Sequence, residues 1–563
     1  MAAVSRRQIV ALGAGMALAL ALADFARAAS EARFDWFEYR GHDPADATPL
    51  KPGEYRNPIL RGFHPDPSLT RVGDDFYLVT STFAYFPGLP VFRSRDLVTW
   101  TQIGNAIDRP DQLDFTGLGL SRGVFAPTIS HRDGTFYILN TCVDCGGNYL
   151  ITATNPAGPW SDPIWIKEID GIDPSFVFDG DRTWILNNGP PEGTPLYEGH
   201  RAIWIQEFDL AARKPIGPRK VLVNGGVDLS TKPIWIEGPH IFKRGGWYYL
   251  SCAEGGTAEG HSQVILRSRN VLGPYEPWSG NPILTQRGLP RDRPHPITSA
   301  GHAQLVETAR GEWWASFLAT QPYAGDLYNT GRETFLLPVK WTDDGWPVIL
   351  PAGQAIPRVH RRPDLPPAPA RTAPAREEFG GEALGPEWMT IRTPRGSWHR
   401  LEGGALVLAG AEPLGGGKGQ PAYAGRRQQH VEAEAVTRVR FTPEHDGDRA
   451  GLAALQSSDF FYALTITRRG GAAVVALERR AGPRDPEHGV TVATAEVPAG
   501  APLDLRITAR GGKYDFAYAR SPGRWITLAA AQDGTILSTK TAGGFVGVTL
   551  GLYAYSPARP DGD

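Results

Sequence analysis

A short unit recurs five times between residues 57 and 350: a turn of polar residues or glycine, followed by aromatic residues that begin a strand. The first aromatic residues of successive copies are 60, 48, 63 and 66 positions apart. Short strands that repeat loosely at this length are typical of β-propeller blades, so five copies predict five blades. The copies are Asp74-Asp75-Phe76-Tyr77, Asp133-Gly134-Thr135-Phe136-Tyr137, Asp181-Arg182-Thr183-Trp184, Gly245-Gly246-Trp247-Tyr248 and Gly311-Glu312-Trp313-Trp314.

The residues ten or eleven positions before these aromatic markers occupy one phase of the repeat, and three of the five are carboxylic acids. Equivalent positions on the innermost strands of a propeller converge on its central axis. Because unpaired buried charge is costly, three acids in one funnel indicate chemistry on a small polar substrate. The five residues are Asp66, Phe125, Asp173, Glu237 and His302.

Asp66 and Asp173 also admit a purely structural interpretation. Each begins an Asp-Pro-Ser sequence, and an aspartate before proline often opens a turn. Either aspartate alone fits that interpretation as well as it fits catalysis. The repeat phase that both share with Glu237 favours catalysis.

The 563-residue chain is too long for one hydrophobic core, and its 66 glycines and 49 prolines suit a turn-rich all-β protein. We expect an irregular, acidic strap at 29–56, a five-bladed β-propeller catalytic domain at 57–350 and a linker at 351–376. Five prolines between 363 and 374 favour an extended spacer there. Short alternating strands, such as 431–436, predict a jelly-roll or concanavalin-like β-sandwich at 377–563.

The N-terminus carries the features of an export signal. Ser5-Arg6-Arg7-Gln8-Ile9 matches a twin-arginine motif, an apolar stretch of 15 residues follows at 9–23, and Ala26-Arg27-Ala28 suits cleavage. An ordinary secretory signal is the alternative. Residues 1–28 therefore predict a periplasmic or secreted protein, and no later segment is apolar and long enough to span a membrane.

The net charge and the cysteine content argue against two further functions, nucleic-acid binding and zinc binding. The formal net charge is −2, so no basic excess indicates nucleic-acid binding. Cys142 and Cys145 suit a small disulfide loop in an oxidising compartment, although an incidental pair is equally compatible with the sequence. A zinc site is not expected, because neither a second such pair nor a suitably spaced histidine is present.

Three segments, taken in order, closely resemble glycoside hydrolase family 43. The β-xylosidase and α-L-arabinofuranosidase members of this family share further signatures at 81–83, 301–303 and 331–334, and the resemblance covers essentially all of 57–350. The C-terminal part is similar to the concanavalin-like sandwich that accompanies such propellers. The three segments are Gly62-Phe63-His64-Pro65-Asp66-Pro67-Ser68, Gly171-Ile172-Asp173-Pro174-Ser175-Phe176 and Ile236-Glu237-Gly238-Pro239-His240.

The resemblance implies an inverting glycosidase with three acidic residues in defined roles. Asp66 matches the general base and Glu237 the general acid. Asp173 matches the acid that tunes and orients the general acid. Inversion needs one ionised carboxylate to activate water and one protonated carboxyl for the leaving oxygen, and a third negative charge helps keep the acid protonated.

Further positions match substrate-binding residues of the family. Phe83 corresponds to an aromatic residue that bounds the sugar pocket, although core packing would explain it too. Arg332 corresponds to an arginine that hydrogen-bonds the substrate, a surface ion pair being the alternative. Phe545 corresponds to an aromatic residue that reaches from the sandwich to the pocket mouth. His302 corresponds to the axial histidine, which in some members ligates a structural calcium ion, and no cofactor is otherwise required.

Phe125 marks a departure from the best-known β-xylosidases, many of which carry Trp and His where this chain has Phe125 and Thr128. The choice between terminal xylose and terminal arabinofuranose therefore stays open. We expect an exported enzyme that removes one of these sugars from hemicellulose oligosaccharides. The alternatives are a carbohydrate-binding protein on a catalytically decayed propeller and a protein-interaction propeller. The sequence does not indicate an oligomeric state.

Overall fold

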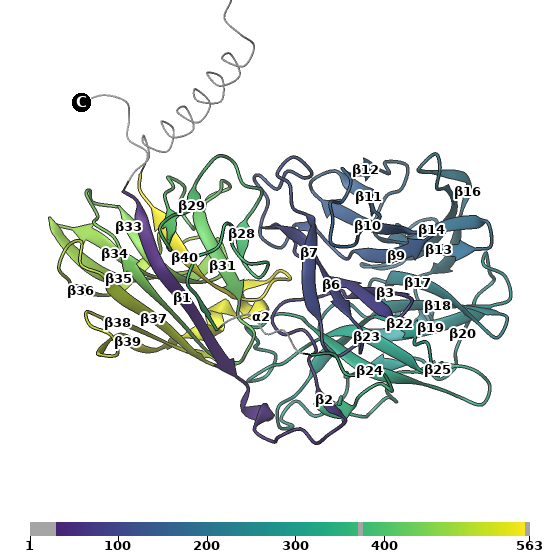
Figure 1. Cartoon of the computed structure of the whole chain (residues 1–563). Coiled ribbons are helices and arrows are strands. Elements are labelled where there is room, and N and C mark those ends of the chain that lie inside the picture. Colours follow the sequence, from purple (N-terminus) through teal and green to yellow (C-terminus); the bar gives the residue numbers. More distant parts are fainter. Residues whose placement is uncertain (1–29, 370–374, 558–563) are drawn as a thin grey trace, which may run out of the picture.

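Five antiparallel sheets follow one another between residues 68 and 348 and form the five blades of a β-propeller, as the repeat predicts (Figure 1). The computed structural model describes residues 30–369 and 375–557, so the expected signal segment 1–28 lies outside the described residues. The blade strands are β3 (Ser68–Val72), β4 (Asp75–Val79), β6 (Gly88–Ser94) and β7 (Thr101–Ile107); β8 (Gly123–Val124), β9 (Thr128–Arg132), β10 (Thr135–Val143), β11 (Gly147–Ala153) and β12 (Ile164–Trp165); β13 (Ile172–Asp179), β14 (Arg182–Gly189), β15 (Ala202–Asp209) and β16 (Lys214–Asn224); β17 (Glu237–Arg244), β18 (Trp247–Glu254), β19 (Ser262–Ser268), β20 (Glu276–Pro277) and β21 (Leu284–Thr285); β22 (Thr298–Glu307), β23 (Trp313–Thr320), β24 (Glu333–Trp341) and β25 (Pro347–Val348).

The aromatic markers of the repeat lie at the start of the second long strand of each blade, namely β4, β10, β14, β18 and β23. The turn before β18 shows why the marker takes this form. Gly245 and Gly246 have φ of 56° and 74°, and a two-residue hairpin turn of this kind requires positive φ at both positions. Marker rings such as Trp247 and Trp313 then pack around the core between blades.

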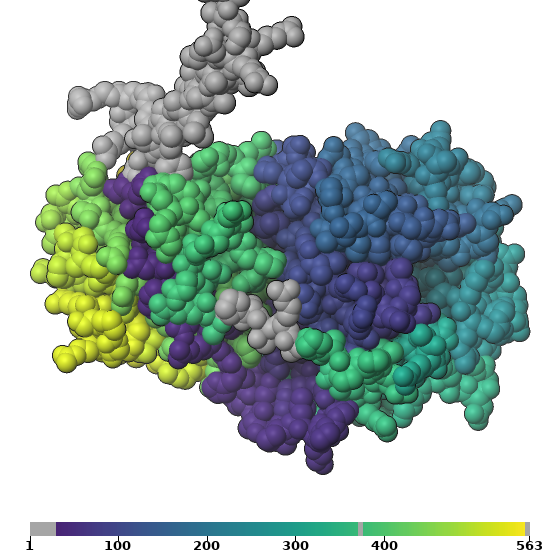
Figure 2. All heavy atoms as spheres, viewed as in Figure 1, coloured from purple at the N-terminus to yellow at the C-terminus, as the bar shows by residue number. Residues whose placement is uncertain are grey.

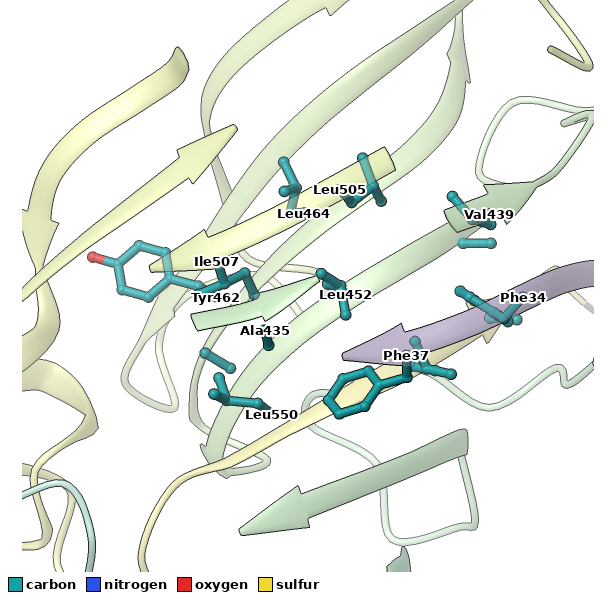
Figure 3. Close-up of a cluster of buried hydrophobic side chains, with 14 of the residues drawn as sticks. Phe34, Phe37, Ala435, Val439, Leu452, Tyr462, Leu464, Leu505, Ile507 and Leu550 are labelled. Atoms are coloured by element: carbon teal, nitrogen blue, oxygen red, sulfur yellow. The ribbon is translucent and has the colours of Figure 1, made fainter. Parts of the chain in front are cut away.

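Two eight-stranded antiparallel sheets form the C-terminal β-sandwich, in agreement with the predicted fold class. Their facing sides enclose one apolar core, part of which is drawn in Figure 3. The other face of the sheet that contains Tyr423 and Phe461 packs against propeller residues such as Phe63. The strands that belong to this region of the chain are β27 (Arg376–Glu377), β28 (Met389–Ile391), β29 (His399–Leu401), β30 (Leu406–Leu408), β31 (Ala422–Arg427), β32 (Glu432–Arg440), β33 (Arg449–Ser457), β34 (Phe460–Arg469), β35 (Ala472–Ala481), β36 (Val490–Glu496), β37 (Leu503–Arg510), β38 (Lys513–Ala519), β39 (Trp525–Asp533) and β40 (Thr549–Tyr555).

The N-terminal segment is not the irregular strap that the sequence suggested. Residues 32–42 form strand β1 (Ala32–His42), which pairs with β32 along nearly its whole length. Phe34 and Phe37 of β1 point into the sandwich core (Figure 3). The prediction was wrong because the strand's charged residues face outward and its pairing partner lies about 400 positions away in the sequence. Figure 2 shows this segment, in purple, lying across the sandwich.

A second strand from outside the C-terminal region also joins a sandwich sheet. Strand β5 (Tyr85–Phe86), from the propeller, pairs with β28 at the end of a sandwich sheet. Behind it, apolar residues of both domains share one cluster that includes Phe63, Tyr423 and Val546. The sandwich therefore packs against the propeller as a continuous structure.

The linker region returns to the propeller before it enters the sandwich. Within the expected spacer, β26 (Val359–Arg361) pairs with β2 (Glu54–Arg56), so this stretch belongs to a two-stranded sheet and is not a free linker. Among the described residues the helices are short: η1 (Pro44–Asp46), η2 (Leu229–Thr231), η3 (Gly534–Leu537) and α2 (Thr539–Ala542). Across residues 30–369 and 375–557, no helix has the length and apolar character needed to cross a membrane.

Candidate active site

All eight residues singled out in the sequence line one cavity of about 290 Å³ at the propeller axis. They come from blades one to five and, through Phe545, from the sandwich. Seven further residues complete the lining. The eight are Asp66, Phe83, Phe125, Asp173, Glu237, His302, Arg332 and Phe545, and the additional residues are Arg122, Ala126, Ile172, Asn188, Arg201, Trp235 and Thr257.

The same local distortion directs several of these side chains inward. Asp66, Asp173 and His302 have φ of 56°, 56° and 51°, and Gly238, the residue after Glu237, has φ of 56°. The pairing register shifts at this point in β13, β17 and β22. A bulge of this kind redirects a side chain from the face of a sheet, so the repeated distortion explains why one sequence phase converges on the axis.

Asp66 is buried and held by two donors. The Ser81 hydroxyl donates to one carboxylate oxygen, and Arg332 Nη1 lies 3.2 Å from the other. A guanidinium at this distance stabilises the ionised form of a buried carboxyl group. Asp66 is therefore equipped to act as a base toward a water molecule in the cavity.

Glu237 has the opposite electrostatic environment. Burial raises its pKa well above the ordinary value, and the negative charges of Asp173 and Asp66 raise it further. No positively charged residue that the structure describes forms an ion pair with it. The Arg332 charge opposes these shifts, but the net change in pKa favours the protonated form that an acid for a leaving oxygen needs.

Asp173 interacts electrostatically with both Asp66 and Glu237. Burial raises its pKa to about 6, His302 opposes this shift, and Asp66 adds to it. One carboxylate oxygen accepts a hydrogen bond from Gly238 N at 3.1 Å. Because Gly238 follows Glu237 directly, this bond fixes the backbone that carries the Glu237 side chain.

Three phenylalanine rings form an aromatic wall on the Asp66 side of the cavity. Phe83 stacks on Phe545 with ring centroids 5.7 Å apart, and Phe125 meets both rings edge-on at 5.5 and 5.6 Å. The Arg332 guanidinium lies 5.1 Å from the Phe545 ring centre and 5.9 Å from that of Phe83. Phe545 is held in place because its backbone N donates to Ser121 Oγ at 2.8 Å.

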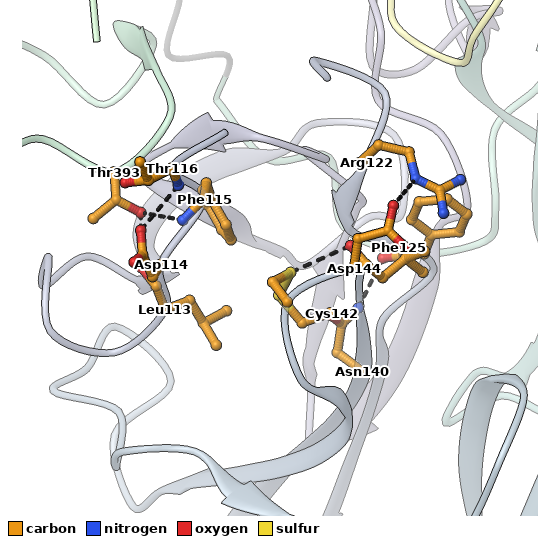
Figure 4. The surroundings of a disulfide bond; sticks show 12 residues. Leu113, Asp114, Phe115, Thr116, Arg122, Phe125, Asn140, Cys142, Asp144 and Thr393 are labelled. Atoms are coloured by element: carbon orange, nitrogen blue, oxygen red, sulfur yellow. Dashed lines mark hydrogen bonds and ion pairs between the residues drawn. A yellow bond between two sulfur atoms is a disulfide. The ribbon is translucent and has the colours of Figure 1, made fainter. Parts of the chain in front are cut away.

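A disulfide bond lies behind the aromatic wall. Cys142 and Cys145 are bridged, and Asp144 between them, with φ of 63°, accepts a 2.6 Å hydrogen bond from Arg122 Nε (Figure 4). The Arg122 guanidinium lies 5.7 Å from the centre of the Phe125 ring. The small loop therefore fixes an arginine of the cavity lining, a role that the sequence did not reveal.

His302 is a buried residue of the cavity lining. The pKa values of the nearby His240 and His261 are lowered chiefly by burial and also by His302. Within residues 30–369 and 375–557, no group of three or more His, Cys, Asp or Glu side chains is arranged to hold a metal ion. Calcium prefers six to eight oxygen ligands. A calcium ion at His302 would therefore need oxygen ligands from elsewhere, such as water molecules, and the possible structural calcium stays a prediction.

Sequence reasoning missed Arg122, Arg201 and Trp235. Arg122 directly precedes Gly123-Val124-Phe125, and Trp235 lies two positions before Glu237, so proximity to the recognised segments was the available signal. Arg201 belongs to a loop between β14 and β15 and carried no local signal.

Comparisons with known proteins agree with this architecture. Residues 55–347 match the family described as Glycosyl hydrolases family 43, and residues 376–562 match the Beta xylosidase C-terminal Concanavalin A-like domain. The chain is 38% identical over 512 residues to a non-reducing end alpha-L-arabinofuranosidase of Bacteroides ovatus, covering 89% of this chain and 91% of that protein. It is 37% identical over 513 residues to a xylosidase/arabinosidase of Butyrivibrio fibrisolvens, covering 89% and 96%.

Solved structures show the same similarity. A GH43_12 protein retrieved from a capybara gut metagenome superposes with a TM-score of 0.85 at 38% identity, covering 93% of this chain and 99% of that one. A xylan beta-1,4-xylosidase from Bacillus halodurans superposes with a TM-score of 0.81 at 33% identity, covering 89% and 96%.

Proposed function

Because the chain belongs to glycoside hydrolase family 43, we propose that it is an inverting, exo-acting enzyme that releases terminal xylose or arabinofuranose from hemicellulose oligosaccharides. Glycoside hydrolase activity follows from the family and from relatives named for such activity. The sugar, the stereochemistry and the exo action are the proposal. One observation carries it: a carboxylate paired with arginine and a buried carboxyl group with a raised pKa line the same cavity.

The proposed reaction is a single displacement. Asp66 removes a proton from a water molecule, whose oxygen attacks the anomeric carbon while the bond to the leaving oxygen breaks. Glu237 gives its proton to that oxygen, so the leaving sugar departs as an alcohol. Asp173 keeps Glu237 protonated through its charge and aligns it through Gly238. The two carboxyl groups supply the chemistry, so no cofactor is part of the proposal.

The aromatic wall supports exo action. Phe83, Phe125 and Phe545 contact one another, which closes the cavity on the Asp66 side. A polysaccharide chain that continued in both directions from the cleaved bond would have to pass through these rings. The alternative of a decayed, non-catalytic binding protein predicts the loss of an acid, and all three are present.

A substrate screen tests the proposal. Purified protein is expected to release aryl alcohol from aryl β-xyloside, aryl α-L-arabinofuranoside or both, and Asp66→Ala is expected to abolish release from each. Wild-type protein that hydrolyses neither substrate, while remaining folded, would contradict the choice of sugar. Full activity in Asp66→Ala would contradict the mechanism.

Export belongs to the same proposal. It is supported by the twin-arginine motif at 5–9 and by the Cys142–Cys145 bond, since disulfides persist in oxidising compartments. Cell fractionation tests it: replacing Arg6 and Arg7 by lysine is expected to keep the protein in the cytoplasm. Unchanged periplasmic or extracellular activity would favour an ordinary secretory signal.

A further inference from the structure

Four exposed apolar side chains lie in the two loops that also carry the cavity-lining residues Arg201 and Trp235. Among the exposed large apolar side chains of residues 30–369 and 375–557, the four are Leu196 at 66% exposed, Leu229 at 42%, Ile234 at 45% and Trp235 at 39%. We call these four residues the rim patch. Apolar side chains gathered beside a pocket mark a binding surface more often than scattered ones do.

The loops that carry the rim patch are locked together. Trp235 N donates to Gly199 O at 2.9 Å, and Gly225 N donates to Arg201 O at 2.9 Å. A Cβ atom at Gly199 would lie 2.9 Å from a methyl carbon of Ile234, and one at Gly225 would lie 2.5 Å from a methyl carbon of Leu229. The patch is thus a preformed surface.

Trp235 is held in a conformation that a bulky residue rarely adopts. Its φ is 48°, in the left-handed region. The conformation is fixed from both sides, because Ile234 O also accepts hydrogen bonds from Gly255 N at 2.8 Å and Gly256 N at 3.1 Å. The result is that the indole lines the cavity while Ile236 is buried in the blade core. A strained, exposed aromatic residue beside an active site points to function rather than to stability.

The position of Glu237 determines which part of a substrate the rim patch faces. A general acid protonates the leaving oxygen, so the leaving group departs on the Glu237 side. Trp235 lies two residues from Glu237, whereas the aromatic wall adjoins Asp66 through Arg332. The rim patch is therefore on the leaving-group side.

We propose that Trp235, Arg201 and the rest of the rim patch form a leaving-group subsite that binds at least two consecutive neutral sugar residues. This inference rests on the proposed function. The apolar face of the first ring stacks on the indole, as sugar and ligand rings do on aromatic pocket walls. Arg201 lines the cavity and forms no ion pair with any residue that the structure describes, so its donors are available to sugar hydroxyls. Ile234, Leu229 and Leu196 extend the surface for the next residue.

The test compares two leaving groups attached to the same terminal sugar. A methyl glycoside and an oligosaccharide both leave as poor alkoxides and both need Glu237, but only the oligosaccharide has a ring to stack on Trp235. The measured quantity is kcat/KM on the oligosaccharide divided by kcat/KM on the methyl glycoside. Trp235→Asn suits the test because asparagine tolerates the left-handed conformation while the indole is removed.

Trp235→Asn is expected to lower this ratio roughly 10- to 100-fold, the usual effect of removing an aromatic anchor, and Trp235→Phe to restore most of it. Arg201→Gln is expected to lower the ratio less. Trp525→Ala, which removes an indole from the sandwich strand β39, serves as the matched control and should leave the ratio unchanged. An unchanged ratio in Trp235→Asn would overturn the subsite. If the ratio is unchanged because kcat/KM falls equally on both substrates, Trp235 only positions Glu237. Wild-type protein inactive on both substrates would instead contradict the proposed function.

Discussion

Arg332 Nη1 lies 3.2 Å from Asp66 Oδ1, and both side chains are more than nine-tenths buried. The pair joins the proposed base to the aromatic wall, since the same guanidinium lies over Phe83 and Phe545. A buried ion pair contributes little net stability but is costly to break from one side, because the remaining charge is left unpaired. The arrangement therefore serves the chemistry of Asp66 more than the stability of the fold.

Arg332→Met tests this relationship. The substitution keeps the apolar stem against the phenylalanines but leaves Asp66 without its cation, so kcat/KM is expected to fall roughly 100-fold or more. Arg332→Lys keeps the positive charge but lacks the planar guanidinium group, so its kcat/KM should lie between the values of wild type and Arg332→Met. Steady-state kinetics on an aryl glycoside measures the effect. Near wild-type kcat/KM in Arg332→Met would exclude a role for the pair in catalysis.

Glu237→Ala is expected to harm substrates unevenly. An acid matters most when the leaving group is a sugar alkoxide and least when it is an activated phenolate. The loss should be roughly 10²- to 10⁴-fold on oligosaccharides and clearly smaller on dinitrophenyl glycosides. Comparison of kcat/KM for the two substrate classes measures the difference. Equal losses would assign Glu237 to binding or structure.

The dependence of activity on pH follows from the same residue. Glu237 must be protonated to act, so kcat/KM falls as pH rises through its raised pKa. After burial, the Asp173 charge is the largest cause of that increase. Asp173→Asn removes the charge, so the pKa of Glu237 should decrease and the alkaline limb of the pH profile should move to lower pH. A limb that stays in place would mean that Asp173 acts only through its bond to Gly238.

Phe545→Ala tests whether the sandwich contributes to the cavity. The substitution removes ring contacts to Phe83 and Phe125 and opens the closed side, so KM for short substrates is expected to rise about tenfold while the protein stays folded. Phe460→Ala, at a partly buried phenylalanine of the sandwich core outside the cavity, is the matched control. Kinetics and a thermal melt of both variants separate the two effects. A rise in KM in both variants would show a general loss of domain packing.

Deleting the sandwich is expected to be far more damaging. Truncation after residue 369 would leave β1 and β5 without their pairing partners and would expose the apolar cluster around Phe63 and Tyr85. Unpaired edges and exposed apolar surface favour aggregation, so the truncated chain should be insoluble or much less active. Expression of residues 29–369 and measurement of the soluble fraction check this. A soluble, fully active propeller would contradict it.

The propeller and five of the eight cavity residues could be predicted because they depend on local signals repeated in phase. Phe83, Arg332 and Phe545 were identified through the family resemblance instead. Asp66, Asp173 and Glu237 each precede an aromatic marker by a similar distance, and the repeated bulge converts that distance into a shared direction. The pairing of strands β1 and β5 with the sandwich sheets was not predicted, because their partner strands are distant in the sequence. Trp235 was not predicted for a different reason. Three backbone hydrogen bonds to neighbouring loops stabilise its left-handed conformation, and no local sequence pattern encodes them.

Hydrolysis is expected to invert the anomeric centre. Water must fit between Asp66 and the anomeric carbon while Glu237 acts from the opposite face, which corresponds to carboxyl groups about 6.5–9.5 Å apart in inverting enzymes, compared with about 5–5.5 Å in retaining ones. Proton NMR in the first minutes of hydrolysis, before mutarotation, identifies the first product. A β-xyloside should yield α-xylose, and an arabinofuranoside should yield the opposite anomer in the same way. A first product of unchanged configuration would make Asp66 a nucleophile. In that case, Asp66→Ala with added azide should form a glycosyl azide of inverted configuration, because the azide would replace the missing carboxylate on the same face.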